Sequence, residues 1–117
     1  MTLGWKLDRS QREALLAALP PRYARTVADH VTLSVSGTDL PEAITTAEII
    51  GHVDDGAGVE AYVVAIDGST SRPDGGTWHI TWSLGENRAA KESNSAIAAH
   101  GWATVAPIPL LLTPAHW

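Results

Sequence analysis

The sequence contains no cysteine among its 117 residues. Disulfides, thiolate nucleophiles and cysteine-ligated zinc sites are therefore excluded, because each of them requires the sulfur of that residue. Any catalysis by this chain must use other side chains. Histidine, of which there are five, is the side chain that exchanges protons most readily near neutral pH.

The sequence also lacks a long hydrophobic run. No apolar stretch approaches the roughly 18 residues that a membrane-spanning helix needs. The first residues, MTLGWKLDRSQRE, do not show the basic and then apolar order of a secretory signal. We therefore expect a soluble, cytoplasmic protein with no membrane partner.

Cations are few, with 8 Lys and Arg against 13 Asp and Glu and a formal net charge of −5. This balance argues against a protein that clamps long nucleic acid, since such binding depends on neutralising many phosphates. It leaves room for a small anionic ligand that meets a few local cations. Several cations lie before and after two of the histidines, His30 and His79: Arg22, Arg25, Arg72, Arg88 and Lys91.

Low-complexity segments and long linkers are absent as well. A hydrophobic fraction of 44% in 117 residues is enough for one compact core and too little for two. We expect a single domain over residues 1–117, and no segment suggests an obligate protein partner.

Hydrophobic periodicity defines the elements of the first half. Residues 8–19 place apolar side chains at helical spacing before Pro20 and Pro21, which predicts one amphipathic helix that covers a sheet. Apolar and polar residues alternate over 27–35, as in a half-buried strand. Residues 44–53 and 59–66 are also strand-like, and the DDGAG turn between them predicts a hairpin.

The second half continues with shorter elements. Residues 68–76 are rich in Ser, Pro, Asp and Gly, which indicates a surface loop that leads into a strand over 78–84. Residues 94–100 predict a short helix that is capped by Ser93 or Asn94 and ended by Gly101. Residues 102–105 and 108–112 are extended pieces interrupted by prolines. The fold class is therefore α+β, with a mainly antiparallel sheet and few helices.

An internal repeat is the most informative feature of the sequence. The six residues HVTLSV that begin at His30 recur as HITWSL from His79, in the shared form His-apolar-Thr-apolar-Ser-apolar. Side chains alternate between the faces of a strand, so His, Thr and Ser should share one face, and Val31, Leu33 and Val35 should enter the core. His and Thr then lie about 6.6 Å apart along the strand, a spacing that lets both reach one phosphate group.

This pair of motifs resembles the paired His-apolar-Thr/Ser-apolar motifs of the 2H phosphoesterase superfamily. The segment GENRAAKESN over 85–94 is also similar to the one that follows the second motif in phosphodiesterase domains related to tRNA ligases and RNA-repair proteins. The resemblance covers residues 28–35 and about 51–102. It implies a compact fold with two pseudo-symmetric motif strands, in a chain shorter than many members of the superfamily.

The resemblance implies a metal-independent phosphodiesterase without a cofactor. His30 and His79 would be the catalytic acid and base, in an order that the sequence does not assign, and Thr32 and Thr81 would bind the phosphate oxygens. The substrate would be a nucleotide or a short RNA, most plausibly one with a 2′,3′-cyclic phosphate end. Two rival functions are cleavage of cyclic oligonucleotide messengers, as in phage counter-defence enzymes, and nucleotide binding without turnover.

Other polar and aromatic residues have two interpretations each. Possible substrate contacts are Tyr23, Arg72, Lys91, Ser93 and Asn94, although a helix cap also explains Ser93 and Asn94, and Tyr23 also suits a core. His52 with Asp54 and Asp55 could bind a metal, but their spacing matches no known ligand set and a polar hairpin face explains them better. His100 at a helix end and His116 in a terminal tail need no function.

Overall fold

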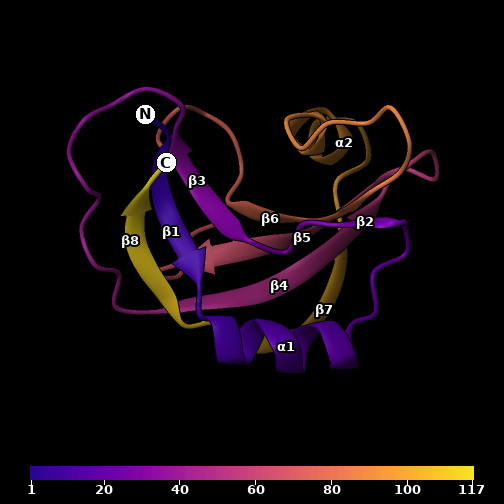
Figure 1. The fold of residues 1–117 in the computed structure, drawn as a ribbon, viewed down its shortest axis with the longest axis horizontal. Coiled ribbons are helices and arrows are strands. Elements are labelled where there is room, and N and C mark those ends of the chain that lie inside the picture. Colours follow the sequence, from indigo (N-terminus) through magenta and orange to yellow (C-terminus); the bar gives the residue numbers. More distant parts are fainter.

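The chain folds into two antiparallel sheets and two helices, which the computed structural model describes over residues 1–117 (Figure 1). In chain order the elements are β1 (Leu3–Leu7), α1 (Arg9–Ala18), β2 (Arg25–Thr26), β3 (His30–Ser34), β4 (Ala47–Asp54), β5 (Val59–Ile66), β6 (His79–Leu84), α2 (Glu92–His100), β7 (Ala103–Pro109) and β8 (Leu112–His116). One sheet has the order β3-β1-β8, and the other has the order β2-β6-β5-β4-β7. The predicted α+β class with antiparallel pairing is confirmed.

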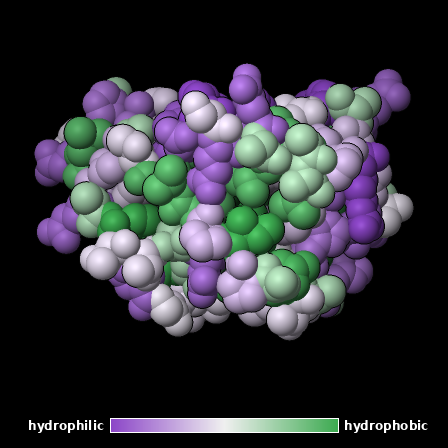
Figure 2. All heavy atoms as spheres, turned by 90° about the horizontal axis from the view of Figure 1, so that it is seen from below, coloured by the Kyte–Doolittle hydropathy of each residue, from purple (hydrophilic) through white to green (hydrophobic).

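Helix α1 agrees with the helix predicted over 8–19. It begins after Asp8, whose carboxylate caps it by accepting a hydrogen bond from the backbone N of Gln11 at 2.9 Å. Leu15 is buried, and Leu16 and Leu19 pack against the main core. Figure 2 views the side on which α1 lies and shows hydrophobic residues toward the middle of that face, with hydrophilic ones along much of its rim.

The predicted hairpin is formed by β4 and β5. The two strands pair antiparallel from Ala47 opposite Ile66 to Asp54 opposite Glu60. Asp55 holds the turn, because its Oδ1 accepts hydrogen bonds from the backbone N atoms of Ala57 and Val59. Strand β4 begins three residues later than the sequence pattern indicated, at Ala47.

The strand predicted over 27–35 is divided between the two sheets. Strand β2 and the next two residues pair with β6, with hydrogen bonds from Val27 N to Trp82 O and from Ala28 N to Thr81 O. The buried Ala28 then adopts a φ of 43°, and β3 continues in the other sheet beside β1. A left-handed residue turns the chain sharply, so this segment links the sheets and brings β3 close to β6 (Figure 1).

The two repeated motifs share an irregularity in strand pairing that was not predicted from their sequences. In β3, Thr32 lies opposite Gly4 and Ser34 opposite Leu3, so Leu33 has no partner. In β6, Thr81 lies opposite Ala61 and Ser83 opposite Glu60, so Trp82 has none. Each strand therefore carries a bulge directly after its Thr, and the alternation of faces changes there.

These bulges correct part of the predicted core. Val31 is fully buried as expected, but Leu33 is only half-buried and Val35 is 79% exposed, because β3 is an edge strand that ends at Ser34. In β6, Leu84 packs in the same cluster as Ala61 and Val63, on the face that carries Thr81. The strict alternation predicted for the sixth position of each motif is therefore wrong.

The C-terminal third also differs from the prediction. Helix α2 begins two residues early, with Lys91 as its N-cap and without a side-chain capping bond, so neither Ser93 nor Asn94 is the cap. Gly101 ends the helix as predicted. His116 lies in β8, which pairs with β1, and not in a tail. Neither helix is long and apolar enough to cross a membrane.

Two hydrophobic clusters hold the elements together. The larger contains Trp5, Leu15, Val31, Ile80 and Trp82, and so joins α1 to both sheets. The smaller packs Ala96 and Ile97 of α2 against Ala61, Val63 and Leu84 of the five-stranded sheet. Apolar side chains of β3 and β6 are thus buried in the larger core, and the His and Thr side chains of these strands face away from it.

Candidate active site

A cavity of about 630 Å³ lies between the two motif strands. Its walls come from β3, from β6, from the loop before β6 and from the start of α2. The polar or charged residues that line it are Thr2, His30, Thr32, Ser34, Arg72, Asp74, His79, Thr81, Lys91 and Asn94, and Trp117 adds an aromatic ring. Both copies of the repeated His-x-Thr motif therefore meet in one cavity.

A glycine allows β3 to approach β1 at this wall. Gly4 lies opposite Thr32 at the bulge, and a Cβ at this position would come within 2.1 Å of Val31 O and 3.1 Å of the Trp117 ring. Only a residue without a side chain fits between these atoms. The Trp117 ring lies 4.5 Å from the ring of His30 at an angle of 56°, so Gly4 makes room for the pair of rings that borders the cavity.

His30 is held by a carboxylate. Its Nδ1 lies 2.9 Å from Asp29 Oδ2, and Asp29 also accepts hydrogen bonds from Lys6 and Arg9. Burial raises the pKa of Asp29, but the bonds from Lys6 and His30 outweigh it and hold that pKa well below its usual value. The carboxylate is therefore an acceptor only, so His30 Nδ1 carries a hydrogen and Nε2 is left for the cavity.

His79 is held by a backbone carbonyl. Its Nδ1 lies 2.8 Å from Thr77 O, which can only accept, so Nδ1 again carries a hydrogen and Nε2 is the free nitrogen. The residue is 8% exposed. Burial lowers the pKa of His79, the Thr77 carbonyl opposes this, and the positive charges of Arg72 and His30 lower it further.

Burial is also the main cause that lowers the pKa of His30, against the opposing effect of Asp29. A positive charge on His30 lowers the pKa of His79, so protonation of one imidazole disfavours protonation of the other. Two coupled imidazoles with lowered pKa values hold fewer than two protons near neutral pH. Such a pair can donate a proton from one ring and accept one on the other.

The two threonines differ in their hydrogen bonds. Thr32 makes no side-chain hydrogen bond within the chain, whereas the Thr81 hydroxyl lies 2.8 Å from Ser93 Oγ and 3.3 Å from Ala90 O. Ser93 is fully buried inside α2, so it contacts Thr81 and not the cavity. If Ser93 donates to Thr81 Oγ1, the single hydrogen of Thr81 is directed to Ala90 O, and an anionic oxygen in the cavity can replace this long contact.

The loop before β6 is fastened to α2 at the rim of the cavity. Arg72 donates to Asp74 Oδ1 at 2.8 Å and to Asn94 Oδ1 at 3.0 Å, which joins the loop to the first turn of α2. Lys91 lines the cavity and makes no ion pair or side-chain hydrogen bond. Arg72, Lys91 and Asn94, which the sequence suggested as substrate contacts, therefore lie together beside the histidines.

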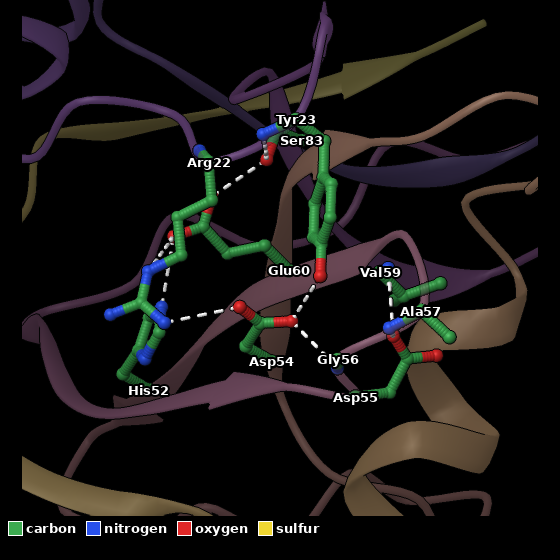
Figure 3. A network of polar contacts seen from close by, with 10 residues as sticks. All are labelled: Arg22, Tyr23, His52, Asp54, Asp55, Gly56, Ala57, Val59, Glu60 and Ser83. Atoms are coloured by element: carbon green, nitrogen blue, oxygen red, sulfur yellow. Dashed lines mark hydrogen bonds and ion pairs between the residues drawn. The ribbon is translucent and has the colours of Figure 1, made fainter.

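Tyr23 lies outside the cavity, in a polar network centred on Glu60 (Figure 3). Its hydroxyl donates to Asp54 at 2.5 Å, and its backbone N donates to Ser83 Oγ. Glu60 is 1% exposed and accepts from Ser83 Oγ at 2.6 Å and from Arg22 N at 3.0 Å. The bulge turns Ser83 toward this network, so the second motif does not place its Ser beside His79.

The residues weighed as a metal site are engaged elsewhere. His52 Nε2 lies 2.9 Å from Glu60 Oε2, Asp54 pairs with Arg22, and Asp55 pairs with Arg88. No group of three or more His, Asp or Glu side chains is arranged to hold a metal ion.

Sequence reasoning missed Asp29 and Trp117. Asp29 directly precedes His30, but Trp78 occupies the matching place before His79, so a comparison of the two motif copies did not single it out. Trp117 reaches the cavity because β8 pairs with β1, a long-range contact with no local pattern. The position of Asp29 directly before the first motif was a signal for that residue, whereas no sequence signal pointed to Trp117.

Comparison of the chain with protein-family models, with curated proteins and with solved structures finds no match. The chemistry of the cavity is therefore inferred from the side chains that form it.

Proposed function

We propose that this chain is a metal-independent phosphodiesterase that acts on nucleotides or short RNA, with 2′,3′-cyclic phosphate ends as its preferred substrate, and that it is a small relative of the 2H phosphoesterases. The observation that carries this proposal is the meeting of both His-x-Thr motifs in one cavity, with both Nδ1 atoms fixed by acceptors. Both imidazoles then have Nε2 available for a substrate.

The proposed reaction divides its work among these side chains. One imidazole removes a proton from water while the water oxygen bonds to phosphorus, and the other protonates the leaving ribose oxygen. Each positioned proton transfer is typically worth roughly 10²- to 10⁴-fold in rate. Thr32 and Thr81 donate to the non-bridging oxygens, where negative charge increases in the transition state.

Replacement of each histidine tests the proposal. We expect His30→Ala and His79→Ala to lower kcat on a nucleoside 2′,3′-cyclic phosphate by at least about 100-fold, with the thermal unfolding midpoint monitored for each variant. His100→Ala is the matched control, because His100 is exposed on α2 and does not line the cavity. Activity of both cavity variants equal to that of the parent, over a panel of cyclic and linear phosphodiesters, would rule out catalysis by this pair.

Cyclic oligonucleotides are a second candidate substrate class. Lys91 is a cation on the cavity wall without an acidic partner, and it could meet a phosphate other than the one being cleaved. Incubation with cyclic di- and trinucleotides, followed by chromatography, separates this substrate class from mononucleotide cyclic phosphates. Tight nucleotide binding without any turnover in the same assays would indicate a binding module in place of an enzyme.

A further inference from the structure

The two cavity histidines occupy the same place in their motifs but have different partners. His30 Nδ1 donates to the Asp29 carboxylate at 2.9 Å, and His79 Nδ1 donates to the Thr77 carbonyl at 2.8 Å. An ionised carboxylate stabilises an imidazolium more than a neutral carbonyl does. The pair is therefore asymmetric in its preference for a proton.

Asp29 is itself held in place from two other elements. Lys6 of β1 donates to Oδ2, and Arg9 at the start of α1 donates to Oδ1 at 3.0 Å and to the backbone O at 3.3 Å. These contacts keep the carboxylate ionised and fix its direction. With three donors from three segments, Asp29 cannot turn away from His30 without losing the other two bonds.

Charges of both signs surround each ring, but only the ring of His30 is in direct contact with a carboxylate. At His79, the positive charges of Arg72 and of a protonated His30 disfavour a proton, Asp74 opposes them more weakly, and the residue is more deeply buried than His30. At His30, Lys6 and Arg9 disfavour a proton, but both are bound to the carboxylate that contacts the ring directly. The Trp117 ring lies 4.5 Å from the ring of His30 at an interplanar angle of 56°, and the indole carries no charge.

We propose that the proton shared by the pair resides on His30, which acts as the general acid, that His79 is the general base, and that Asp29 is a positioning residue for His30. This inference rests on the proposed function and assigns the order that the repeat alone left open.

The proposed step balances in protons. His79 Nε2 takes a proton from water as the water oxygen forms a bond to phosphorus. The bond from phosphorus to the leaving oxygen breaks, and that oxygen receives the proton of His30 Nε2. From a 2′,3′-cyclic phosphate the product is one nucleoside phosphomonoester that carries the freed ribose hydroxyl. His79 then releases one proton to solvent and His30 takes one up, which restores the starting state.

The leaving group separates the two roles. A nucleoside 3′-(4-nitrophenyl phosphate) releases a stable phenolate that needs no protonation, whereas a 2′,3′-cyclic phosphate releases a ribose oxygen that does. We expect His30→Ala to lose about 10²- to 10⁴-fold on the cyclic phosphate and less than about 10-fold on the nitrophenyl ester. We expect His79→Ala to lose activity on both substrates.

Asp29 is tested by the pH profile. Asp29→Asn removes the charge that favours the imidazolium, so the alkaline limb of the kcat profile should move to lower pH, and Asp29→Glu should restore it in part. A fall in kcat with an unchanged alkaline limb would indicate a merely structural role and would overturn the assignment of Asp29. Should Asp29→Asn fail to fold, the leaving-group comparison still tests the roles of the histidines.

The outcomes distinguish this inference from the proposed function. A parent chain that cleaves neither substrate overturns the proposed function. A parent that cleaves both, with His79→Ala and not His30→Ala rescued by the nitrophenyl leaving group, reverses the acid and base and overturns the inference alone. Equal losses for both variants on both substrates overturn it as well.

Discussion

At the scale of single residues, Lys91 differs from the other cations of the chain. Five of them pair with carboxylates, namely Lys6, Arg9, Arg22, Arg72 and Arg88, and Arg12 and Arg25 donate to backbone carbonyls. Lys91 has neither kind of partner and lines the cavity. In a chain of net charge −5, this ammonium is the one positive group that an anionic ligand can reach without displacing a carboxylate or a carbonyl.

We expect Lys91→Ala to lower kcat/KM by about 10- to 100-fold, because a hydrogen bond to a charged group contributes about 1.5–3 kcal/mol. The loss should fall mainly on KM, since a flexible surface cation binds ground state and transition state alike. Lys91→Arg is the matched control and should retain most activity. Steady-state kinetics on the best substrate of the screen measure both, and an unchanged KM in Lys91→Ala would contradict a phosphate contact.

Ser93 acts through Thr81 at the same scale. Removal of its hydroxyl takes away the 2.8 Å bond that holds Thr81 Oγ1 and leaves only the 3.3 Å contact with Ala90 O, so the Thr81 hydroxyl is less firmly oriented toward the phosphate. We expect Ser93→Ala to lower kcat by about 10-fold, within the range for one lost transition-state donor. Ser95→Ala, on the exposed side of α2, should have no effect on kcat. Equal kinetics for the two variants would show that Ser93 does not orient Thr81.

At the scale of elements, the paired bulges and the crossover at Ala28 determine where the motifs point. The bulge after Thr32 requires the backbones of β1 and β3 to approach closely at Gly4. The bulge after Thr81 turns Ser83 to Glu60, which in turn accepts from Arg22 N in the segment after α1 (Figure 3). Each bulge therefore does two things: it positions a His-x-Thr pair and it fastens a neighbouring segment.

We expect Gly4→Ala to lower the free energy of unfolding by about 3 kcal/mol, because its Cβ would overlap a backbone carbonyl that cannot move without breaking the pairing of β1 and β3. The control is Gly56→Ala, where a Cβ meets no atom within 4 Å and only the φ of 72° is unfavourable, at about 1 kcal/mol. Urea unfolding of both variants measures the difference. A smaller loss for Gly4→Ala than for Gly56→Ala would contradict this account of the bulge.

Glu60, in the polar network outside the cavity, is expected to contribute more to stability than the other glutamate of the same hairpin, Glu48. Its removal leaves Ser83, His52 and the backbone N of Arg22 without their acceptor. A hydrogen bond to a charged group contributes about 1.5–3 kcal/mol, so the loss of two of them costs about 3–6 kcal/mol. We expect Glu60→Ala to lose stability in this range in urea unfolding. Glu48→Ala is the matched control, since Glu48 lies in β4 without a side-chain partner and should change stability by less than about 0.5 kcal/mol. Similar losses for the two would show that the network contributes little.

At the scale of the whole molecule, the cavity makes stability depend on pH. Burial lowers the pKa values of His30 and His79, so the unfolded chain binds more protons than the folded chain once the pH falls below about 6.5. Stability is therefore lost on acidification through this range. Asp29, whose pKa is also lowered in the fold, adds a further loss as the pH falls below about 4.

We expect the free energy of unfolding to decrease from pH 7 to pH 5, by at most about 1.4 kcal/mol per pH unit for each histidine. Replacement of both histidines by Gln should flatten this slope, whereas His100→Gln should not, because His100 is exposed. Urea unfolding at several pH values measures the slopes. A parent chain that becomes more stable on acidification over this range would contradict the lowered pKa values of the two histidines.

Local periodicity was sufficient for much of the fold. The helix after Asp8, the hairpin of β4 and β5, and β6 all appear close to the predicted residues, because capping, turn chemistry and alternation act within a few positions. The predictions that were wrong concern elements whose bounds depend on contacts with distant segments of the chain. Strand β8 exists because β1 accepts it as a partner, and α2 begins early because Ser93 is buried against Thr81.

The same division applies to the cavity. The repeat, by itself, determined that His30, Thr32, His79 and Thr81 are equivalent in chemistry and spacing, since those are properties of residue type and strand geometry. Only the tertiary structure decided that the motifs face one cavity, that Ser83 and Tyr23 belong to the opposite network, and that Asp29 distinguishes one histidine from the other. The physical reason is that a left-handed turn at Ala28, two bulges and the burial of each ring depend on contacts between segments far apart in the chain.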